Sequence, residues 1–329
     1  MVSVGRTAMC YCEKTRKTGM KKISVLVPCY NEKDNIIPLS HAIEEELVKS
    51  CPQYDYEICF IDNNSTDGTR QLVREICGKN NKIKAILNIR NFGPFNSQFY
   101  GLTQLTGDCG IIISADFQDP VELIPEMVKK WESGAKIVAT VKESNEENKI
   151  INFIRTIYYK LLRKLSDVEI IEQFTGFGLY DREFIEILKK LNDSEPFLRG
   201  IVAELGYKIE YVRYKHAKRR SGKSKFSLYK LFDAAMLSFT TYTKVGLRIA
   251  TISGAIIAFL SMCVAIWYFI YKLLFWNSVP IGIAPLIIGV FFLGSLQLFF
   301  IGFLGEYIMN INHRVMSRPL VIEEERINW

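Results

Sequence analysis

Three short polar clusters hold the side chains of the N-terminal part of the chain that are best suited to chemistry. They span residues 28–32, 62–69 and 114–120. Asp116 and Gln118 offer hard oxygen ligands of the kind that Mg²⁺ or Mn²⁺ takes when it bridges a diphosphate. Asp62 can accept a hydrogen bond from a base or a ribose hydroxyl. These residue types predict a metal-assisted site for a nucleoside diphosphate.

The second cluster also contains residue types that serve structure. Ser65, Asp67 and Gly68 are typical of turns and helix N-caps, and we interpret them as structural. No G-x-G-x-x-G follows the first apolar run, and G-x-x-x-x-G-K-[ST] occurs nowhere in the chain. A dinucleotide-dependent dehydrogenase and a P-loop nucleotidase are therefore disfavoured.

Short apolar runs alternate with amphipathic stretches before and between these clusters. We expect strands at 23–27, 56–61, 84–87 and 110–114, and helices at 35–50, 69–77, 97–105 and from 121 onward. This alternation predicts an α/β domain with a mostly parallel sheet covered on both faces. Ligands of such sheets bind beyond the carboxyl ends of the strands, where the three clusters lie, so one site built from three loops is expected.

Two long uncharged runs occupy the C-terminal third of the chain, at 249–271 and 279–305. Each is long enough to cross a hydrocarbon core of about 30 Å as a helix. We predict two transmembrane helices within residues 247–310; two buried helices of a soluble core are the alternative. Cations are more numerous outside the two runs than in the connector between them, which predicts that both chain ends face the cytoplasm.

The segment before the first run combines amphipathic and basic character. Apolar residues recur at helical spacing within 227–246, which is typical of a helix lying in the membrane interface. Residues 208–230 contain nine Lys and Arg residues and one acid, Glu210. Such a segment suits phosphate groups of lipids or ligands, and a solvated basic face is the alternative.

Six ordered motifs connect the chain to a known family. They are V-L-V-P-C-Y-N-E-K-D-N-I, I-D-N-N-S-T-D-G-T, R-N-F-G-P-F-N-S-Q-F-Y-G-L, S-A-D-F-Q-D-P, R-S-G-K-S-K-F-S-L-Y-K-L and G-E-Y-I-M-N-I-N-H-R-V-M-S-R-P-L. With them, the chain resembles the family-2 glycosyltransferases that act on polyisoprenyl phosphates, the dolichyl-phosphate mannose synthase and bactoprenol glucosyltransferase group. The resemblance runs from about Lys22 to Glu325.

The resemblance implies a complete architecture. It comprises a basic N-terminal extension at 1–20, a cytoplasmic GT-A-like glycosyltransferase domain at 21–226, a juxtamembrane helix at 227–246, two transmembrane helices at 247–310 and a cytoplasmic tail at 311–329. The protein is then a multi-pass enzyme of the cell (inner) membrane. Its implied partners are a nucleotide-sugar donor, a polyisoprenyl phosphate acceptor, membrane lipid and further copies of itself, without nucleic acid, and its implied cofactor is Mg²⁺ or Mn²⁺.

The resemblance also assigns residues to the donor site. The implied nucleotide-binding residues are Pro28, Tyr30, Glu32, Asp62, Ser114, Ala115 and Arg219, and the implied metal ligands are Asp116 and Gln118. Three positions depart from the pattern of many relatives. Ser114 replaces an aspartate of D-A-D, Asp62-Asn63-Asn64-Ser65 replaces D-D-G-S, and Phe177-Gly178-Leu179 replaces F-R-L. One carboxylate fewer at the metal predicts weaker metal affinity.

The implied reaction needs little base catalysis, because a phosphate monoester is largely dianionic at neutral pH. The catalytic demand falls on the leaving nucleoside diphosphate, which a metal and cations must stabilise. The candidate catalytic residues are Asp116, Lys142, Arg155, Lys223 and Lys225. Of these, Lys142 and Arg155 are candidates for the acceptor phosphate, with a solvated helix charge as the alternative for each.

The expected reaction is inverting transfer of a hexose from UDP-glucose to undecaprenyl phosphate. UDP-galactose, a UDP-N-acetylhexosamine and GDP-mannose remain alternative donors. A processive polysaccharide synthase is disfavoured because Q-x-x-R-W is absent. A non-catalytic membrane anchor or flippase subunit with a degenerate transferase domain is the alternative from another functional class.

Overall fold

The computed structural model describes residues 19–142, 171, 173–191, 193, 196–214, 283–315 and 318–329, with scattered positions between 252 and 274. Most of the predicted N-terminal extension, the predicted juxtamembrane helix at 227–246 and about half of the first predicted membrane span lie outside these residues.

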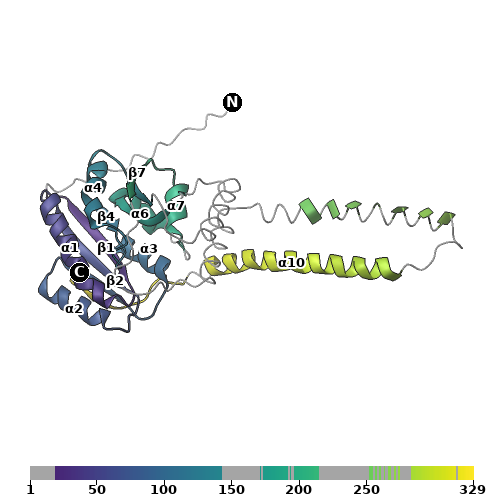
Figure 1. Cartoon of the computed structure of the whole chain (residues 1–329), viewed down its shortest axis with the longest axis horizontal. Helices are drawn as coiled ribbons and strands as arrows, with labels where there is room; N and C mark the ends of the chain where they lie inside the picture. The colour runs from purple at the N-terminus through teal and green to yellow at the C-terminus, as the bar shows by residue number, and fades with distance from the viewer. Residues whose placement is uncertain are drawn as a thin grey trace, which may run out of the picture.

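An eight-stranded sheet forms the centre of the α/β domain (Figure 1). Its strands are β1 (Lys22–Cys29), β2 (Asp55–Asp62), β3 (Ile83–Asn88), β4 (Cys109–Ile112), β5 (Ile137–Lys142), β6 (Phe174–Asp181), β7 (Ile209–Tyr214) and β8 (Glu323–Ile327). Their order across the sheet is β7-β5-β6-β4-β1-β2-β3-β8. The predicted mostly parallel sheet is confirmed, with β6 and β8 as the antiparallel members.

Helices cover both faces of this sheet. The described helices are α1 (Lys33–Ser50), α2 (Thr69–Lys79), α3 (Pro94–Gln104), α4 (Ile124–Glu132) after the short 3₁₀ turn η1 (Val121–Leu123), α6 (Arg182–Leu191), α7 (Leu198–Glu204) and α10 (Ile283–Val315). One core cluster joins α1, α2 and α4 to the sheet. A second cluster joins α3, α6 and α7 to the other face. The covered sheet explains why its central parallel strands are mostly apolar.

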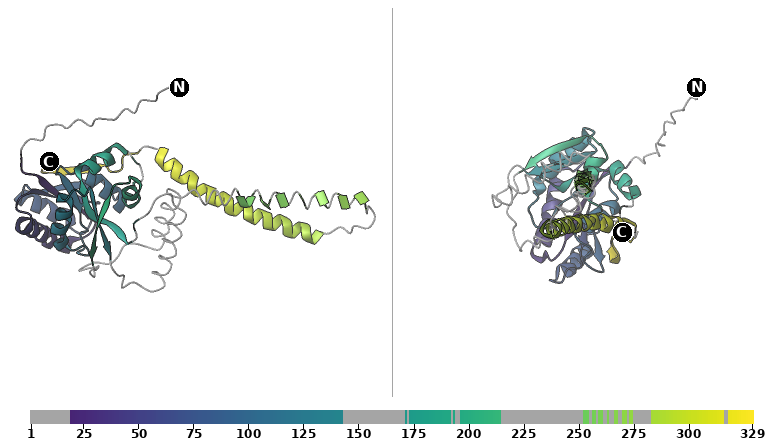
Figure 2. Two further views of the ribbon diagram at one scale, coloured as in Figure 1. Left: turned by 90° about the horizontal axis from the view of Figure 1, so that it is seen from above. Right: turned by 90° about the vertical axis from the view of Figure 1, so that its right-hand side faces the viewer.

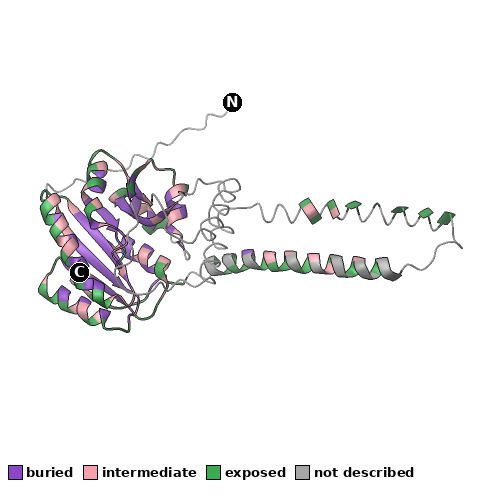
Figure 3. Cartoon of the chain, viewed as in Figure 1, coloured by how far each residue is buried: buried purple, intermediate pink, exposed green. Residues whose placement is uncertain are grey.

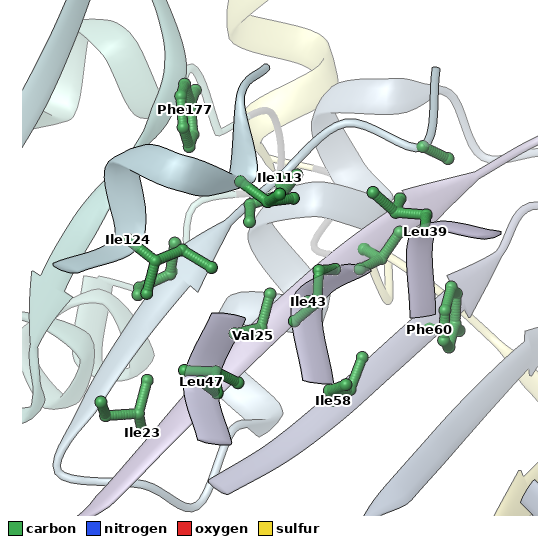
Figure 4. Packing of buried hydrophobic residues seen from close by; sticks show 14 of the residues in the cluster. Ile23, Val25, Leu39, Ile43, Leu47, Ile58, Phe60, Ile113, Ile124 and Phe177 are labelled. Carbon is green, nitrogen blue, oxygen red and sulfur yellow. The ribbon is translucent and has the colours of Figure 1, made fainter. Parts of the chain in front are cut away.

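The packing of α1 shows how this layer is built. Ile43 and Leu47 lie one helical turn apart and meet Val25 of β1 and Ile58 of β2 (Figure 4). All four side chains are buried, and the outward faces of the helices carry the exposed positions (Figure 3). Leu26, the next residue of β1, belongs to the opposite core cluster, as the alternation of side chains along a strand requires.

A buried carboxylate lies near the start of β2, on the half of the strand away from the polar clusters. Glu57 accepts hydrogen bonds from the Ser24 hydroxyl at 2.6 Å and from the Thr106 hydroxyl at 2.6 Å. It also pairs with the Lys84 ammonium at 2.9 Å. Burial alone would raise the pKa of Glu57, but the bonds from Ser24, Thr106 and Lys84 outweigh it and lower the pKa to about 2.

We expect Glu57→Gln to lower the free energy of unfolding at pH 7 by about 3 kcal/mol, because it leaves Lys84 beside an uncharged buried group. A lowered pKa stabilises the fold above the unfolded pKa, so the wild type loses this advantage as pH falls from 4.5 towards 2. Denaturant unfolding at pH 7 and pH 3 checks this. A difference between wild type and variant that is independent of pH would contradict it.

The 33-residue helix α10 extends away from the α/β domain (Figures 1 and 2). Large apolar side chains along it are exposed, among them Leu286, Leu298 and Ile308. Counted over the residues that the structure describes, no helix combines the length and the apolar composition needed to cross a membrane. The two membrane-spanning helices stay a prediction from the sequence.

The C-terminal residues return to the sheet. After α10 the chain forms β8, which pairs with β3 and completes one edge. The predicted tail at 311–329 thus contains a strand of the α/β domain.

Candidate functional site

The three polar clusters lie together at the carboxyl ends of the parallel strands, as predicted; this end of the sheet is called the site edge below. Cys29 at the end of β1 is the register partner of Asp62 at the end of β2. Ile113, directly after β4, donates its backbone N–H to Leu26 of β1 at 2.9 Å. Because β1, β2 and β4 are parallel, the three loops that follow them emerge side by side.

The first two loops are joined by reciprocal hydrogen bonds. The backbone N–H of Asn31 donates to the Ser65 hydroxyl at 2.8 Å, and the backbone N–H of Thr66 donates to Asn31 Oδ1 at 2.7 Å. Asn31 has a positive φ of 54°, which asparagine tolerates better than most residues. The backbone N–H of Lys33 donates to Asp67 Oδ2 at 3.2 Å. Ser65 and Asp67 are therefore structural, as interpreted from the sequence.

Asp62 lies fully buried beneath this pair of loops. Its carboxylate accepts a hydrogen bond from the Ser65 backbone N–H at 3.0 Å and another from the Ser65 hydroxyl. Arg70 Nε of α2 lies 3.4 Å from Asp62 Oδ2. Burial raises the pKa of Asp62 against the opposing effect of these donors. Asp62 thus fixes the loop, and its contact with a base or ribose stays a prediction.

A fourth loop, residues 89–93 after β3, joins the site through Asn63. The buried Asn63 amide donates to the Gly93 carbonyl at 3.0 Å. Its Oδ1 accepts the backbone N–H of Phe92 at 2.9 Å and the Asn88 amide at 3.2 Å. No role was predicted for Asn63 from the sequence. Its partners Phe92 and Gly93 belong to the motif R-N-F-G-P-F-N, which is the signal that could have pointed to it.

We expect Asn63→Asp to lower the free energy of unfolding by about 2 kcal/mol, because a carboxylate cannot donate to the Gly93 carbonyl. Asn64→Asp is the matched control: among the described residues, the Asn64 side chain bonds through its Oδ1, as acceptor from Arg70 at 3.0 Å, and aspartate keeps that oxygen. Thermal unfolding of both variants decides the matter. Equal melting temperatures would show that the amide donor contributes nothing.

The third loop presents Asp116 on a tight turn. Asp116 is buried, and its Oδ1 accepts the backbone N–H of Gln118 at 3.2 Å. Phe117 between them has a φ of 59°. Ala115 is buried as well, whereas Ser114 is exposed at the rim of the turn.

Asp119 holds this turn from within the domain. Its Oδ2 accepts the backbone N–H of Ser114 at 3.0 Å, and its Oδ1 accepts the hydroxyl of Tyr214, at the end of β7, at 3.1 Å. Burial raises the pKa of Asp119. Both oxygens of Asp119 thus accept hydrogen bonds that hold the turn, and Asp116 is the carboxylate of the turn that the sequence predicts as a metal ligand.

The turn could supply only some of the ligands that a divalent cation needs. Asp116 and Gln118 supply hard oxygen atoms of the type that Mg²⁺ and Mn²⁺ prefer. Within the described part of the chain, no group of three or more His, Cys, Asp or Glu side chains could hold a metal ion. Further ligands for a cation at Asp116 would then be water or oxygens of a bound ligand, such as a diphosphate.

The other predicted site residues divide into two groups. Pro28, Tyr30 and Glu32 lie half-buried at the site edge, where Glu32 Oε2 accepts the Asn35 amide at 2.8 Å. Lys142 ends β5, which runs in the same direction as β4, so it belongs to the site edge too. The other predicted cations, Arg155, Arg219, Lys223 and Lys225, lie outside the described residues.

Gly178, where the resemblance to F-R-L implies an arginine, lies in the middle of β6 between β4 and β5. A Cβ at this position would lie 2.5 Å from the backbone carbonyl oxygen of Val138. The strand therefore has no room for a side chain there. An arginine at this position is excluded by packing, independently of what the acceptor requires.

Comparison with known proteins agrees with this arrangement. Residues 24–188 match the family described as "Glycosyl transferase family 2". The chain is 34% identical over 302 residues to the SfII prophage-derived bactoprenol glucosyl transferase of Shigella flexneri, covering 92% of this chain and 97% of that protein. It is 32% identical over 302 residues to the prophage bactoprenol glucosyl transferase homolog of Escherichia coli (strain K12), covering 92% and 98%.

Among solved structures, glucosyl-3-phosphoglycerate synthase from Mycobacterium tuberculosis, in complex with Mn²⁺, uridine diphosphate and phosphoglyceric acid, matches with a TM-score of 0.47 at 21% identity. That match covers 67% of this chain and 77% of the synthase. The family match spans the strands and loops that build the site, and the relatives align along nearly the whole chain. The chain belongs to glycosyl transferase family 2.

Proposed function

We propose that this protein transfers a hexose from UDP-glucose to undecaprenyl phosphate, with inversion at the anomeric carbon. The observation that carries the proposal is the row of loops at the carboxyl ends of β4, β1, β2 and β3, with the buried Asp116 in the loop after β4, in a chain similar along 92% of its length to a bactoprenol glucosyl transferase. Members of the same family that use other donors make UDP-galactose, UDP-N-acetylhexosamines and GDP-mannose the competing choices.

The donor binds at the loops after β1, β2 and β4. Tyr30, Glu32 and the loop fixed by Asp62 lie beside the base and ribose, and the turn from Ser114 to Gln118 lies beside the diphosphate. The rigidity of these loops supports the assignment, because Asn31 and Ser65 lock them to each other before any ligand binds. Such preorganisation lowers the entropic cost of holding the donor.

A divalent cation bound at Asp116 and Gln118 would neutralise charge on the diphosphate and make it a better leaving group. The protein's part is to hold these oxygens in a buried turn, which Asp119 fixes through the Ser114 backbone N–H. Arg219, Lys223 and Lys225 are proposed to add positive charge beside the leaving group.

The acceptor phosphate attacks the anomeric carbon from the face opposite the leaving group. With a second pKa of about 6, a phosphate monoester is mostly dianionic at neutral pH and needs no base to remove a proton. One phosphate oxygen forms the new glycosidic bond, and the bond to the nucleoside diphosphate breaks with its electron pair. Lys142 and Arg155 are proposed to orient the acceptor phosphate.

We place the reaction at the cytoplasmic face of the cell membrane, with both chain ends in the cytoplasm and further copies of the chain as partners. Two uncharged runs of the sequence support two spanning helices. The exposed Leu286, Leu298 and Ile308 of α10 support an apolar environment for that helix.

The test is transfer itself. The purified full-length protein is incubated with undecaprenyl phosphate, Mn²⁺ and each of the four candidate donors, and the lipid products are read by mass. We expect one hexose on the lipid phosphate with UDP-glucose. A product with another donor would change the sugar assignment, whereas no lipid product with any donor would favour a non-catalytic anchor or flippase subunit.

A further inference from the structure

The C-terminal strand β8 contacts more than the edge of the sheet. It pairs with β3 in antiparallel fashion, with Leu87 opposite Glu325 and Ala85 opposite Ile327. The backbone N–H of Ile89 also donates to the Ile322 carbonyl at 3.1 Å. This places three consecutive acidic residues, Glu323 to Glu325, beside β3, where α2 covers one face of the sheet and α3 covers the other.

Arg70, in the first turn of α2, connects one of these acids to the donor loop. Its Nη2 donates to Glu324 Oε2 at 2.8 Å, and its Nη1 donates to Asn64 Oδ1 at 3.0 Å. Its Nε lies 3.4 Å from Asp62 Oδ2, so the two groups form an ion pair, but the geometry is too poor for a hydrogen bond. The Arg70 side chain is 16% exposed, so these contacts are largely shielded from water.

The loop needs such an anchor at Asn64. This residue has a φ of 63°, in the left-handed region, and stands between Asp62 and Ser65. Ser65 holds Asp62 by two hydrogen bonds and is itself bound to Asn31 of the first loop. A shift of Asn64 would therefore move the two loops that carry the predicted base and ribose contacts.

We propose that Glu324 is a positioning residue for the nucleotide-sugar site, acting through Arg70. The Glu324 carboxylate fixes the guanidinium in the orientation that reaches Asn64 and Asp62 together. The C-terminal strand, which follows α10 in the chain, thereby sets the geometry of the donor loop. The donor part of this inference rests on the proposed function; the effect on the loop does not.

The strand contains its own matched control. Glu325, the next residue, pairs with Arg74 of α2 at 2.8 Å. In the described part of the chain, the Arg74 side chain makes no hydrogen bond or ion pair with residues 62–68. Glu324 and Glu325 are similarly exposed, at 50% and 41% of the side chain. Removing either carboxylate weakens the attachment of β8, but only Glu324→Ala releases Arg70.

Hydrogen exchange tests the effect on the loop without any ligand. In the full-length protein, Glu324→Ala is expected to speed exchange in a peptide covering residues 62–68 by about threefold, the size expected for losing a half-exposed ion pair. Glu325→Ala is expected to leave that peptide at the wild-type rate. Equal exchange in the two variants would overturn the proposal.

Donor kinetics test the functional part. Glu324→Ala is expected to raise KM for UDP-glucose by about threefold with kcat little changed, while Glu325→Ala matches the wild type. Arg70→Ala and the double variant Arg70→Ala/Glu324→Ala should then have similar KM values, because the two residues act as a unit. Independent, additive effects would contradict the link. If the wild type transfers no sugar, the proposed function fails, and hydrogen exchange still decides the role of Glu324.

Discussion

Replacing Asp116 with asparagine is expected to lower hexose transfer by about a thousandfold. Asp116 is the buried carboxylate proposed to bind a cation in the turn after β4, which Asp119 holds by accepting hydrogen bonds from Ser114 and Tyr214. Asparagine keeps the oxygen that accepts the Gln118 backbone N–H, so the turn should survive. The variant therefore removes charge and leaves the geometry of the loop in place.

A metal titration of transfer provides the measurement. Ser114→Asp adds a second hard anion at an exposed position of the same turn and is expected to lower the Mn²⁺ concentration needed for half-maximal activity. The melting temperatures of both variants should stay close to that of the wild type. Full metal-dependent activity in Asp116→Asn would show that the metal site had been placed in the wrong loop.

Restoring arginine at position 178 is expected to destabilise the domain by about 4 kcal/mol. A Cβ there would lie 2.5 Å from the Val138 carbonyl oxygen, which belongs to the backbone of a paired strand and cannot move without breaking the sheet. The physical reason is overpacking at the centre of β6. Soluble expression and thermal unfolding check the result.

Gly78→Arg is the control for this substitution. Gly78 lies in α2, and a Cβ there would meet no atom within 4 Å. We expect its unfolding temperature to equal or exceed that of the wild type, because arginine favours helix more than glycine does. If Gly178→Arg unfolds at the wild-type temperature, the middle of β6 is not packed as described.

The location of the site could be predicted from the sequence because it depends on local pattern. Apolar runs that end in polar clusters mark the carboxyl ends of strands, and parallel strands bring those ends together. The residue types at Asp116 and Gln118 then indicate the chemistry. The predicted strand boundaries differ from the observed ones by only a few residues, as at 110–114 against Cys109–Ile112.

The features that were not predicted, β8 and the role of Asn63, depend on contacts between segments that are distant in the chain. β8 reads E-E-E-R-I, which lacks the apolar alternation of a strand because it lies at a sheet edge where charged side chains can face water. Its partner Arg70 is 254 positions away from Glu324 in the chain. Asn63 was missed for the same reason, since its partners come from the loop after β3.

Gly178 shows a different limit of sequence comparison. Compared with F-R-L, the sequence has a glycine at the position where the resemblance implies an arginine. In the fold, this position is a packing position inside the sheet, where the Val138 carbonyl leaves no room for any side chain. Sequence comparison identifies a difference in residue type, but only the backbone around it shows what that difference means.

The most direct test of the proposed reaction compares two acceptors that differ by one phosphate. The full-length protein is incubated with UDP-glucose, Mn²⁺ and either undecaprenyl phosphate or undecaprenol, and the lipids are analysed by mass. If the phosphate is the nucleophile, undecaprenyl phosphate gains one hexose and undecaprenol gives no product. Transfer to both lipids at similar rates, or release of free glucose alone in both reactions, would contradict the proposed mechanism.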